Sequence, residues 1–247
     1  MSIITSPNPA LITSGAPFTI DDGFEVNPII AARSDGSFIV AWGVPGDDPD
    51  AVKAQIFGAD LMPVTDPFSV STTSLRYPEQ PQILVDGDNS FTIFWSEEKD
   101  GHIYFGGQMA QRFTAEGVAD GEAYEIIAEP EGDLLRDTQL VALQEGGFAL
   151  IWSEALSYFD AVASLHGQIF DATGTAQGAV FDIGTMAPRS SSQFSTTTQD
   201  DGTIAVSWVA GPLGGSNTDV AVRLFSAQGI ALDSAVILSQ EAETVDL

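Results

Sequence analysis

The chain has 247 residues, 44% of them hydrophobic, which is enough to bury a sizeable core in one large all-β domain or in two ordinary ones. Eight Lys and Arg against 35 Asp and Glu give a net charge of −27, which argues against nucleic acid and anionic membranes as partners, because both require basic side chains. The absence of cysteine excludes disulfides and thiolate metal sites.

The N-terminal segment 1–16 contains no Lys or Arg and no long apolar core, so it lacks the pattern of a secretory signal peptide. No apolar run in the sequence approaches the ~20 residues that a membrane-spanning helix needs. We therefore expect no membrane insertion, and either a cytoplasmic protein or one that is exported without an N-terminal signal.

Short strands follow from residue 17 onward. Residues 17–20 (Pro-Phe-Thr-Ile) match residues 67–70 (Pro-Phe-Ser-Val), so we predict an extra N-terminal strand there. A first unit spans about 21–70, and its strands are predicted at 28–33, 37–42, 51–57 and about 68–70. The second strand alternates in hydrophobicity and follows an Asp-Gly turn, which is the pattern of a β-hairpin.

Two aromatic landmarks show that this unit is repeated. The four tryptophans lie 53, 57 and 56 residues apart, and they are Trp42, Trp95, Trp152 and Trp208. A phenylalanine follows each of them after 15 to 18 residues, and the four are Phe57, Phe113, Phe170 and Phe225. Two landmarks that stay in phase over four copies indicate a propeller or a solenoid. We expect these eight aromatic side chains to pack between neighbouring units rather than to bind a ligand.

The other units repeat the plan at about 71–126, 127–183 and 184–238, and an acidic tail occupies 239–247. Their fourth strands are predicted at about 124–126, 181–183 and 236–238. A turn between the third and fourth strands carries a glycine in three units, whereas unit 1 has Leu61 at that place; the three glycines are Gly117, Gly174 and Gly229. Residues 1–247 therefore form a single repeat domain.

The sequence predicts an all-β fold, a β-propeller-like arrangement of four four-stranded units plus the extra N-terminal strand. The alternative is an open linear array of β-sheets. Blade closure stays open at this point, because the extra strand would either complete the last unit or pair with another chain. A homo-oligomer through the terminal strands is one of these outcomes.

The repeated phrase resembles a known family. Asp35 to Trp42 has the form Asp-Gly-x-apolar-x-Val-x-Trp, and residues 168–174 have the form Gln-x-Phe-x-Ala-x-Gly. Both are similar to the tandem repeat of large secreted bacterial RTX-associated exoproteins and adhesins. The resemblance covers about 18–238 and implies an extracellular propeller-like module exported without an N-terminal signal. The calcium-binding nonapeptide repeats of those proteins are absent here, and the resemblance brings no catalytic residues.

Binding is expected in the loops after each second strand and before each first strand, because these loops differ in length and share one face. They are acidic, and six residues in two clusters are candidate ligands of Ca²⁺, which prefers carboxylate oxygens. The six are Asp47, Asp48, Asp50, Glu97, Glu98 and Asp100. The alternative is that these are solvated acidic loops that bind no metal.

Arginines enter the units on the same face. Arg76, Arg136 and Arg189 precede their tryptophans by 16 to 19 residues, and Tyr77 lies beside the first of them. A guanidinium suits the carboxylate or sulfate of an acidic sugar, so we predict that these four residues bind a ligand. The alternative is pairing with neighbouring acids such as Asp137.

No catalytic motif is present: the chain shows no Ser-His-Asp order, no phosphate loop and no HExxH. His102 and His166 occupy different places in their units, so they do not form a metal pair by spacing. The sequence favours a non-enzymatic secreted module that binds a glycan or another protein through loops on one face. The alternatives are an assembly subunit that polymerises by strand addition and a propeller enzyme that acts on polysaccharide through two carboxylates.

Overall fold

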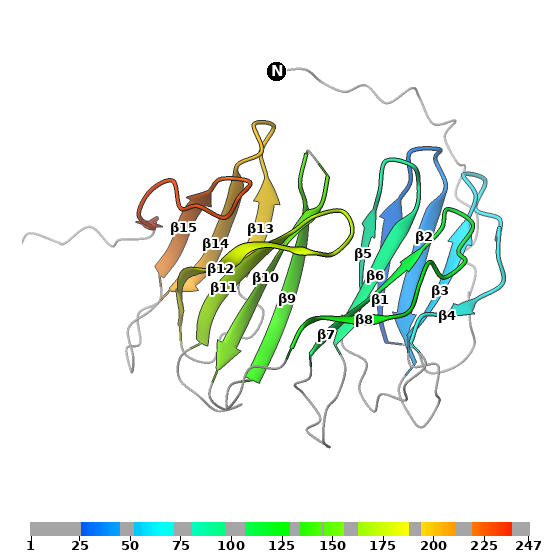
Figure 1. Ribbon diagram of the computed structural model, residues 1–247, viewed down its shortest axis with the longest axis horizontal. Helices are drawn as coiled ribbons and strands as arrows, with labels where there is room; N and C mark the ends of the chain where they lie inside the picture. The colour runs from blue at the N-terminus through cyan, green and yellow to red at the C-terminus, as the bar shows by residue number, and fades with distance from the viewer. Residues whose placement is uncertain are drawn as a thin grey trace, which may run out of the picture.

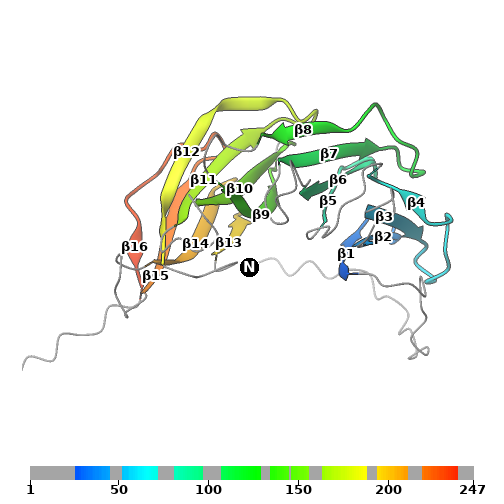
Figure 2. The same cartoon turned by 90° about the horizontal axis from the view of Figure 1, so that it is seen from below.

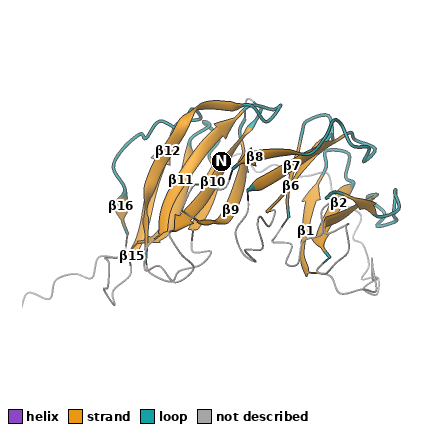
Figure 3. Cartoon of the chain, turned by 60° about the horizontal axis from the view of Figure 1, so that its bottom comes forward, coloured by secondary structure: helices purple, strands orange, loops and turns teal. Residues whose placement is uncertain are grey.

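The computed structural model describes residues 26–44, 52–71, 81–96, 107–128, 134–144, 146–155, 163–187, 194–210 and 219–238. These residues form β-strands joined by turns and loops, and Figure 3 shows no helix among them. Within these ranges no helix is long and apolar enough to cross a membrane. The extra strand predicted at 17–20 and the acidic tail at 239–247 lie outside the described residues.

The strands form four antiparallel four-stranded sheets, each built from strands that are consecutive in the chain (Figure 1). Blade 1 contains β1 (Val26–Ala32), β2 (Phe38–Gly43), β3 (Val52–Phe57) and β4 (Phe68–Ser69). Blade 2 contains β5 (Gln82–Val85), β6 (Phe91–Ser96), β7 (Gln108–Phe113) and β8 (Tyr124–Ile127). Blade 3 contains β9 (Leu134–Ala142), β10 (Phe148–Ala155), β11 (Ala163–Phe170) and β12 (Ala176–Met186). Blade 4 contains β13 (Phe194–Thr198), β14 (Ile204–Ala210), β15 (Asp219–Phe225) and β16 (Val236–Ile237).

The innermost strands bring the blades together, because β1 contacts β5, β5 contacts β9 and β9 contacts β13. Figure 2 shows the blades following one another along an arc, with blade 1 and blade 4 at its two ends. The prediction of a propeller of four four-stranded units is confirmed, and the alternative of a linear array is not what the chain forms. Such radial repetition leaves only short sheet edges uncovered.

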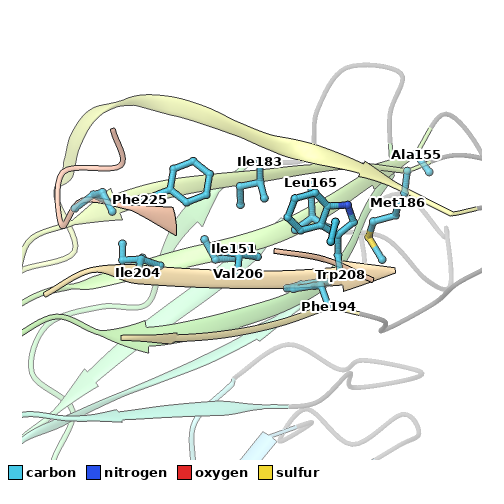
Figure 4. Packing of buried hydrophobic residues seen from close by; sticks show 14 residues of the cluster. Ile151, Ala155, Leu165, Ile183, Met186, Phe194, Ile204, Val206, Trp208 and Phe225 are labelled. Carbon is cyan, nitrogen blue, oxygen red and sulfur yellow. The ribbon is translucent and has the colours of Figure 1, made fainter. Parts of the chain in front are cut away.

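The second strands of blades 2, 3 and 4 each present their tryptophan to the preceding blade. One cluster joins Ile39 and Ala41 of blade 1 to Trp95 of blade 2, and the other two junctions repeat this arrangement around Trp152 and Trp208. Figure 4 shows the third junction, in which Ile151, Leu165 and Ile183 lie against Ile204, Val206 and Trp208. We call this side of a blade its tryptophan face and the other side its opposite face. The predicted packing of these aromatics between neighbouring units is therefore confirmed at the three junctions.

The glycine of the third turn lies beneath an aromatic residue of the preceding blade. A Cβ atom on Gly117 would lie 3.1 Å from Phe68, and one on Gly229 would lie 2.5 Å from Phe181. A Cβ atom on Gly174 would overlap Tyr124 in the same way. All three glycines also have a positive φ, between 75° and 83°. Only glycine meets both requirements without strain, which explains its recurrence at this turn.

The exception in unit 1 has a structural reason. Leu61 takes the place of the glycine with a φ of 67°, and blade 1 has no described blade in front of its tryptophan face. At the other end of the arc, Val236 takes the place that Phe68 and its equivalents occupy on the fourth strand. The two terminal blades therefore depart from the repeat at the two positions that face away from the other blades.

Two glutamines link the innermost strands across blade junctions. The Gln82 amide donates to the Thr138 carbonyl and hydroxyl at 2.9 Å and accepts from the Leu140 N–H at 2.8 Å. Gln139 repeats this one blade later, bonding to the Phe194 carbonyl at 2.7 Å and to the Thr196 N–H at 3.1 Å. Each amide thus supplies hydrogen bonds to the edge of a strand that has no neighbouring strand on that side. The corresponding residue in blade 1 is Ile29, which packs in the core instead.

The glutamine of the repeated Gln-x-Phe phrase has a local role. Its side chain donates to a backbone carbonyl ahead of the fourth strand in blades 1 and 2, from Gln55 to Thr65 and from Gln111 to Gly121, and at the start of the fourth strand in blade 3, from Gln168 to Gln177. These glutamines are buried, so each bond satisfies a polar group that water does not reach. The phrase is a folding feature of the blade, like the Asp-Gly turn.

Candidate functional site

One end of the blades carries the variable loops. Because the strands alternate in direction, the connections after each second strand and each fourth strand leave the sheets at the same end, which we call the loop end. The short first and third turns lie at the opposite end, which we call the turn end. Most loop-end residues fall outside the described ranges, which resume where the strands begin.

The residues predicted from the sequence as ligands belong to these loops. Nine of them lie outside the described residues: Asp47, Asp48, Asp50, Glu97, Glu98, Asp100, Arg76, Tyr77 and Arg189. Arg136 was expected in a loop, but its backbone belongs to β9, where it pairs with Ser153. β9 begins at Leu134, before the predicted loop position, because Leu135 is buried in the core between blades 2 and 3 and so extends the strand toward the loop end.

A cluster of polar side chains sits at the loop end of blade 3. The Asp182 carboxylate lies 3.0 Å from the His166 Nδ1 atom, and the Glu154 carboxylate lies 3.6 Å from Nε2 on the other side of the ring. The Trp152 indole N–H donates to the second Glu154 oxygen at 2.7 Å. These four residues, Trp152, Glu154, His166 and Asp182, are called the blade 3 cluster below.

The register of the sheet brings the cluster together. His166 on β11 pairs with Trp152 on β10 and with Asp182 on β12, so the three side chains are cross-strand neighbours on the tryptophan face. Glu154 and His166 are largely shielded from water, whereas the Asp182 side chain is 89% exposed. The cluster therefore reaches from the junction between blades 2 and 3 out to solvent.

This arrangement can move a proton. A neutral imidazole that donates from Nδ1 to Asp182 has its acceptor nitrogen, Nε2, directed toward Glu154. The distance of 3.6 Å between Nε2 and Glu154 is longer than a hydrogen bond, so a proton passes between the two groups when they move closer or through one water. Asp182 orients the ring and Trp152 holds the carboxylate. Across the parts of the chain that the structure describes, no three His, Asp or Glu side chains are placed to hold a metal ion.

The cluster is a specialisation of blade 3 and not part of the repeat. The residue paired with the tryptophan is Lys53 in blade 1, Met109 in blade 2 and Ala221 in blade 4, so the histidine is particular to blade 3. The acid two places after the tryptophan recurs as Glu97 in blade 2, whereas blades 1 and 4 have Val44 and Ala210 there. Trp208 instead donates to the Thr185 carbonyl at 3.1 Å. Sequence reasoning treated His166 as isolated, because its partners appear only when the pairing of three strands is known.

Acidic residues at the turn end have a different role. Asp35, Asp88, Asp171 and Asp201 each accept hydrogen bonds from the Ser or Thr two residues later, within a first or third turn. These bonds hold the pKa of all four carboxyls below the usual value. Such bonds stabilise the turns, so these carboxylates belong to the scaffold.

The sequence matches no family model and no curated protein. Among solved structures, the chain is similar to an α-L-arabinanase from Penicillium chrysogenum complexed with arabinobiose, with 14% identity, a TM-score of 0.55, and 86% of this chain and 64% of that chain covered. An α-L-arabinofuranosidase from Lactobacillus brevis matches with 10% identity and a TM-score of 0.52, covering 87% and 72%. An endo-arabinase from Bacteroides thetaiotaomicron matches with 12% identity and a TM-score of 0.50, covering 87% and 81%. At these identities the likeness shows the β-propeller fold alone.

Proposed function

We propose that this protein is a propeller that acts on a polysaccharide, cleaving it at the loop end of blade 3. The observation that carries the proposal is the pairing of Glu154 with His166, an acid–base pair that the described residues show in blade 3 and that the repeat does not require. The likeness to arabinan-cleaving propellers supports a polysaccharide as the substrate class. This reverses the preference for a non-enzymatic module that the sequence alone favoured.

The proposed roles follow from the geometry of the cluster. Glycoside hydrolysis breaks the bond between the anomeric carbon and the departing oxygen, which takes up a proton, and joins a water oxygen to that carbon. Glu154 would supply the proton, because it is the carboxylate of the cluster that is largely shielded from water. His166 is the group that exchanges a proton with Glu154, and Asp182 is a positioning residue that fixes the orientation of the ring. Trp152 also positions Glu154, because its indole N–H holds one carboxylate oxygen.

The predicted arginines extend the proposal to acidic sugars. Arg76, Arg136 and Arg189 would neutralise the carboxylates of a uronate-containing chain, which the acidic surface would otherwise repel. The predictions of an extracellular location and of export without an N-terminal signal agree with a polysaccharide target. They stay predictions, as does the resemblance to RTX-associated exoproteins.

A panel of polysaccharides tests the activity. Arabinan, arabinoxylan, galactan, pectate and alginate are incubated with the protein, and new reducing ends and unsaturated uronate products are measured. Glu154→Gln and His166→Gln should each lower the cleavage of the preferred polymer, by roughly 100-fold for the acid. Glu116→Gln is the matched control, because Glu116 is exposed at the turn end of blade 2. The proposal fails if the protein cleaves no polymer, or if both cluster variants keep full activity while remaining folded.

A non-enzymatic glycan-binding module is the second candidate. It is favoured by one feature of the cluster, namely that both of its carboxylates already have a partner in His166, as they would in a purely structural network. In that case affinity electrophoresis should show retardation in a polysaccharide gel without any loss of polymer. Replacement of Arg76, Arg136 and Arg189 by Ala should abolish the retardation, whereas Glu154→Gln should leave it unchanged.

A further inference from the structure

The arc leaves two blade faces that no described blade covers. These are the tryptophan face of blade 1 and the opposite face of blade 4, which lie at the two ends of the arc in Figure 2. Contacts between neighbouring blades link blade 1 to 2, 2 to 3 and 3 to 4, and no comparable contact joins blade 4 to blade 1 in the described ranges. The three inner junctions show what each kind of face normally packs against.

The tryptophan face of blade 1 has the residues of a junction and only part of its burial: Trp42 and Phe57 are 3% and 2% exposed, as at the inner junctions, but the residues beside them are more open. Phe38 and Val40 are half-buried, whereas the equivalent Phe91 and Ile93 of blade 2 are 0% exposed. Ile30, which pairs with Val40 on this face, is 64% exposed. Phe38 still stacks on Phe57 with the ring centroids 5.2 Å apart, as Phe91 does on Phe113. The face is therefore built like those inside the arc and remains partly open to water.

The opposite face of blade 4 is open in the same manner. Val220, Val236 and Leu238 are 42%, 54% and 63% exposed. At the first junction, Val52 and Val70 occupy the positions of Val220 and Leu238 and are 0% and 5% exposed. The two terminal faces together expose apolar side chains where the inner junctions bury them, which marks an interaction surface.

The two faces also match each other in size. At the inner junctions a large aromatic residue of one blade covers a glycine in the third turn of the next. At the terminal faces the aromatic residue is replaced by the smaller Val236 and the glycine by the larger Leu61. In a junction between blade 4 and blade 1, the smaller Val236 would therefore meet the larger Leu61, and the two side chains together would still fill the space that an aromatic residue and a glycine fill at the inner junctions.

We propose that a second copy of this chain docks on these faces, with blade 4 of one copy packed against blade 1 of its partner. A second copy is the molecule that supplies both faces with the matching residues, and the contact continues the pattern of the inner junctions. Two four-bladed copies joined in this way reach about eight blades, a number at which propellers close. The contact is heterologous, because different surfaces meet, and two copies that each make it with the other close a ring.

The acidic surface controls the conditions for this association. A net charge of −27 on each copy opposes the approach of two copies at low salt. Screening by salt shortens this repulsion and leaves the apolar contact in place, so the association should strengthen as salt rises. Contacts held mainly by ion pairs would show the reverse dependence.

Sedimentation velocity of the full chain, over a range of concentrations in 0.05 M and 0.5 M NaCl, tests the proposal. The wild-type protein should gain mass with concentration at the higher salt. Ile30→Asp and Val236→Asp place a charge on one terminal face each, at exposed positions that tolerate it in the monomer. Each variant alone should stay monomeric, and Val118→Asp, at a 63% exposed site of blade 2, should behave as the wild type.

A mixture of the two variants gives the decisive result. Ile30→Asp keeps an intact blade 4 face and Val236→Asp keeps an intact blade 1 face, so an equimolar mixture should form pairs although neither variant associates alone. The proposal is overturned if the wild type is monomeric under all conditions, which would point to terminal faces covered within one chain. It is also overturned if the mixture stays monomeric, or if Val118→Asp dissociates the protein as the other two variants do.

Discussion

Replacement of Gly229 by Ala measures how tightly one blade locks into the next. The new Cβ atom would lie 2.5 Å from Phe181 Cδ1, well inside contact distance, and the residue would keep a φ of 75°. A side chain in this left-handed conformation costs about 1–2 kcal/mol. Overfilling a packed site adds about 1–3 kcal/mol, so the free energy of unfolding should fall by about 2–5 kcal/mol.

Gly202→Ala separates the two contributions. Gly202 has a φ of 83°, but a Cβ atom there would lie 3.9 Å from its nearest neighbour, Ala227, so only the conformational cost remains. This variant should lose about 1–2 kcal/mol. The difference between the two variants is the cost of the contact with Phe181, read from urea denaturation followed by tryptophan fluorescence.

A double variant checks the assigned cause. Phe181→Val should lower the stability by itself, since Phe181 contacts Phe225 with ring centroids 5.0 Å apart. In that background Gly229→Ala should cost no more than Gly202→Ala does in the wild type, because the smaller side chain makes room. Equal losses for Gly229→Ala and Gly202→Ala, or an unchanged loss in the Phe181→Val background, would refute the proposed interlock.

Three further predictions follow from the same structure. Gln139→Met should reduce the free energy of unfolding by about 1–3 kcal/mol, because it leaves the Phe194 carbonyl and the Thr196 N–H without their partner, whereas Gln228→Met at an exposed turn should change it little. The pKa of the four turn aspartates is lowered in the folded protein, so their charged forms stabilise the fold above the unfolded pKa of about 3.9, and this stabilisation is lost as the pH falls through the folded pKa. Asp171→Asn should therefore destabilise the protein at pH 7 and make no difference near pH 2. Urea denaturation midpoints measured over that pH range check this prediction. If Ca²⁺ binds the loop-end acids as predicted, millimolar Ca²⁺ should raise the melting temperature by an amount that depends on its concentration, and EGTA should reverse the rise. The double variant Asp47→Asn with Asp50→Asn should lose half or more of this rise. A melting temperature that does not change with Ca²⁺ would contradict the site.

The repeat made the fold predictable. Trp42 and its three equivalents recur because each blade meets its neighbour through the same face, so a pattern in the sequence reports a pattern in space. Strand lengths were less well predicted. The fourth strand of blade 3 was expected at about 181–183, but β12 runs from Ala176 to Met186, because it follows the whole of β11 across two irregularities in the register.

The contacts between distant residues could not be predicted in this way. Gln139 bonds to the backbone of another blade, and backbone groups are present in every sequence, so no residue type near Thr196 indicates this hydrogen bond. The blade 3 cluster forms because the pairing of three strands brings Glu154, His166 and Asp182 together from separate positions in the chain. The signal that could have found it is a histidine at the position that pairs with the repeated tryptophan, together with an acid two residues after that tryptophan.

The contact between an aromatic residue and a turn glycine restricts how this chain could be lengthened or shortened. Blades 2 and 3 each carry a glycine toward the preceding blade and an aromatic residue toward the next, so either could be duplicated or deleted while the new neighbours still fit. Blade 1 cannot follow an aromatic-bearing blade, because Leu61 would meet Phe181 or its equivalent. Gene duplication is thus permitted for blades 2 and 3, whereas Leu61 restricts blade 1 to a place behind a blade that carries a small residue, such as Val236, on its fourth strand.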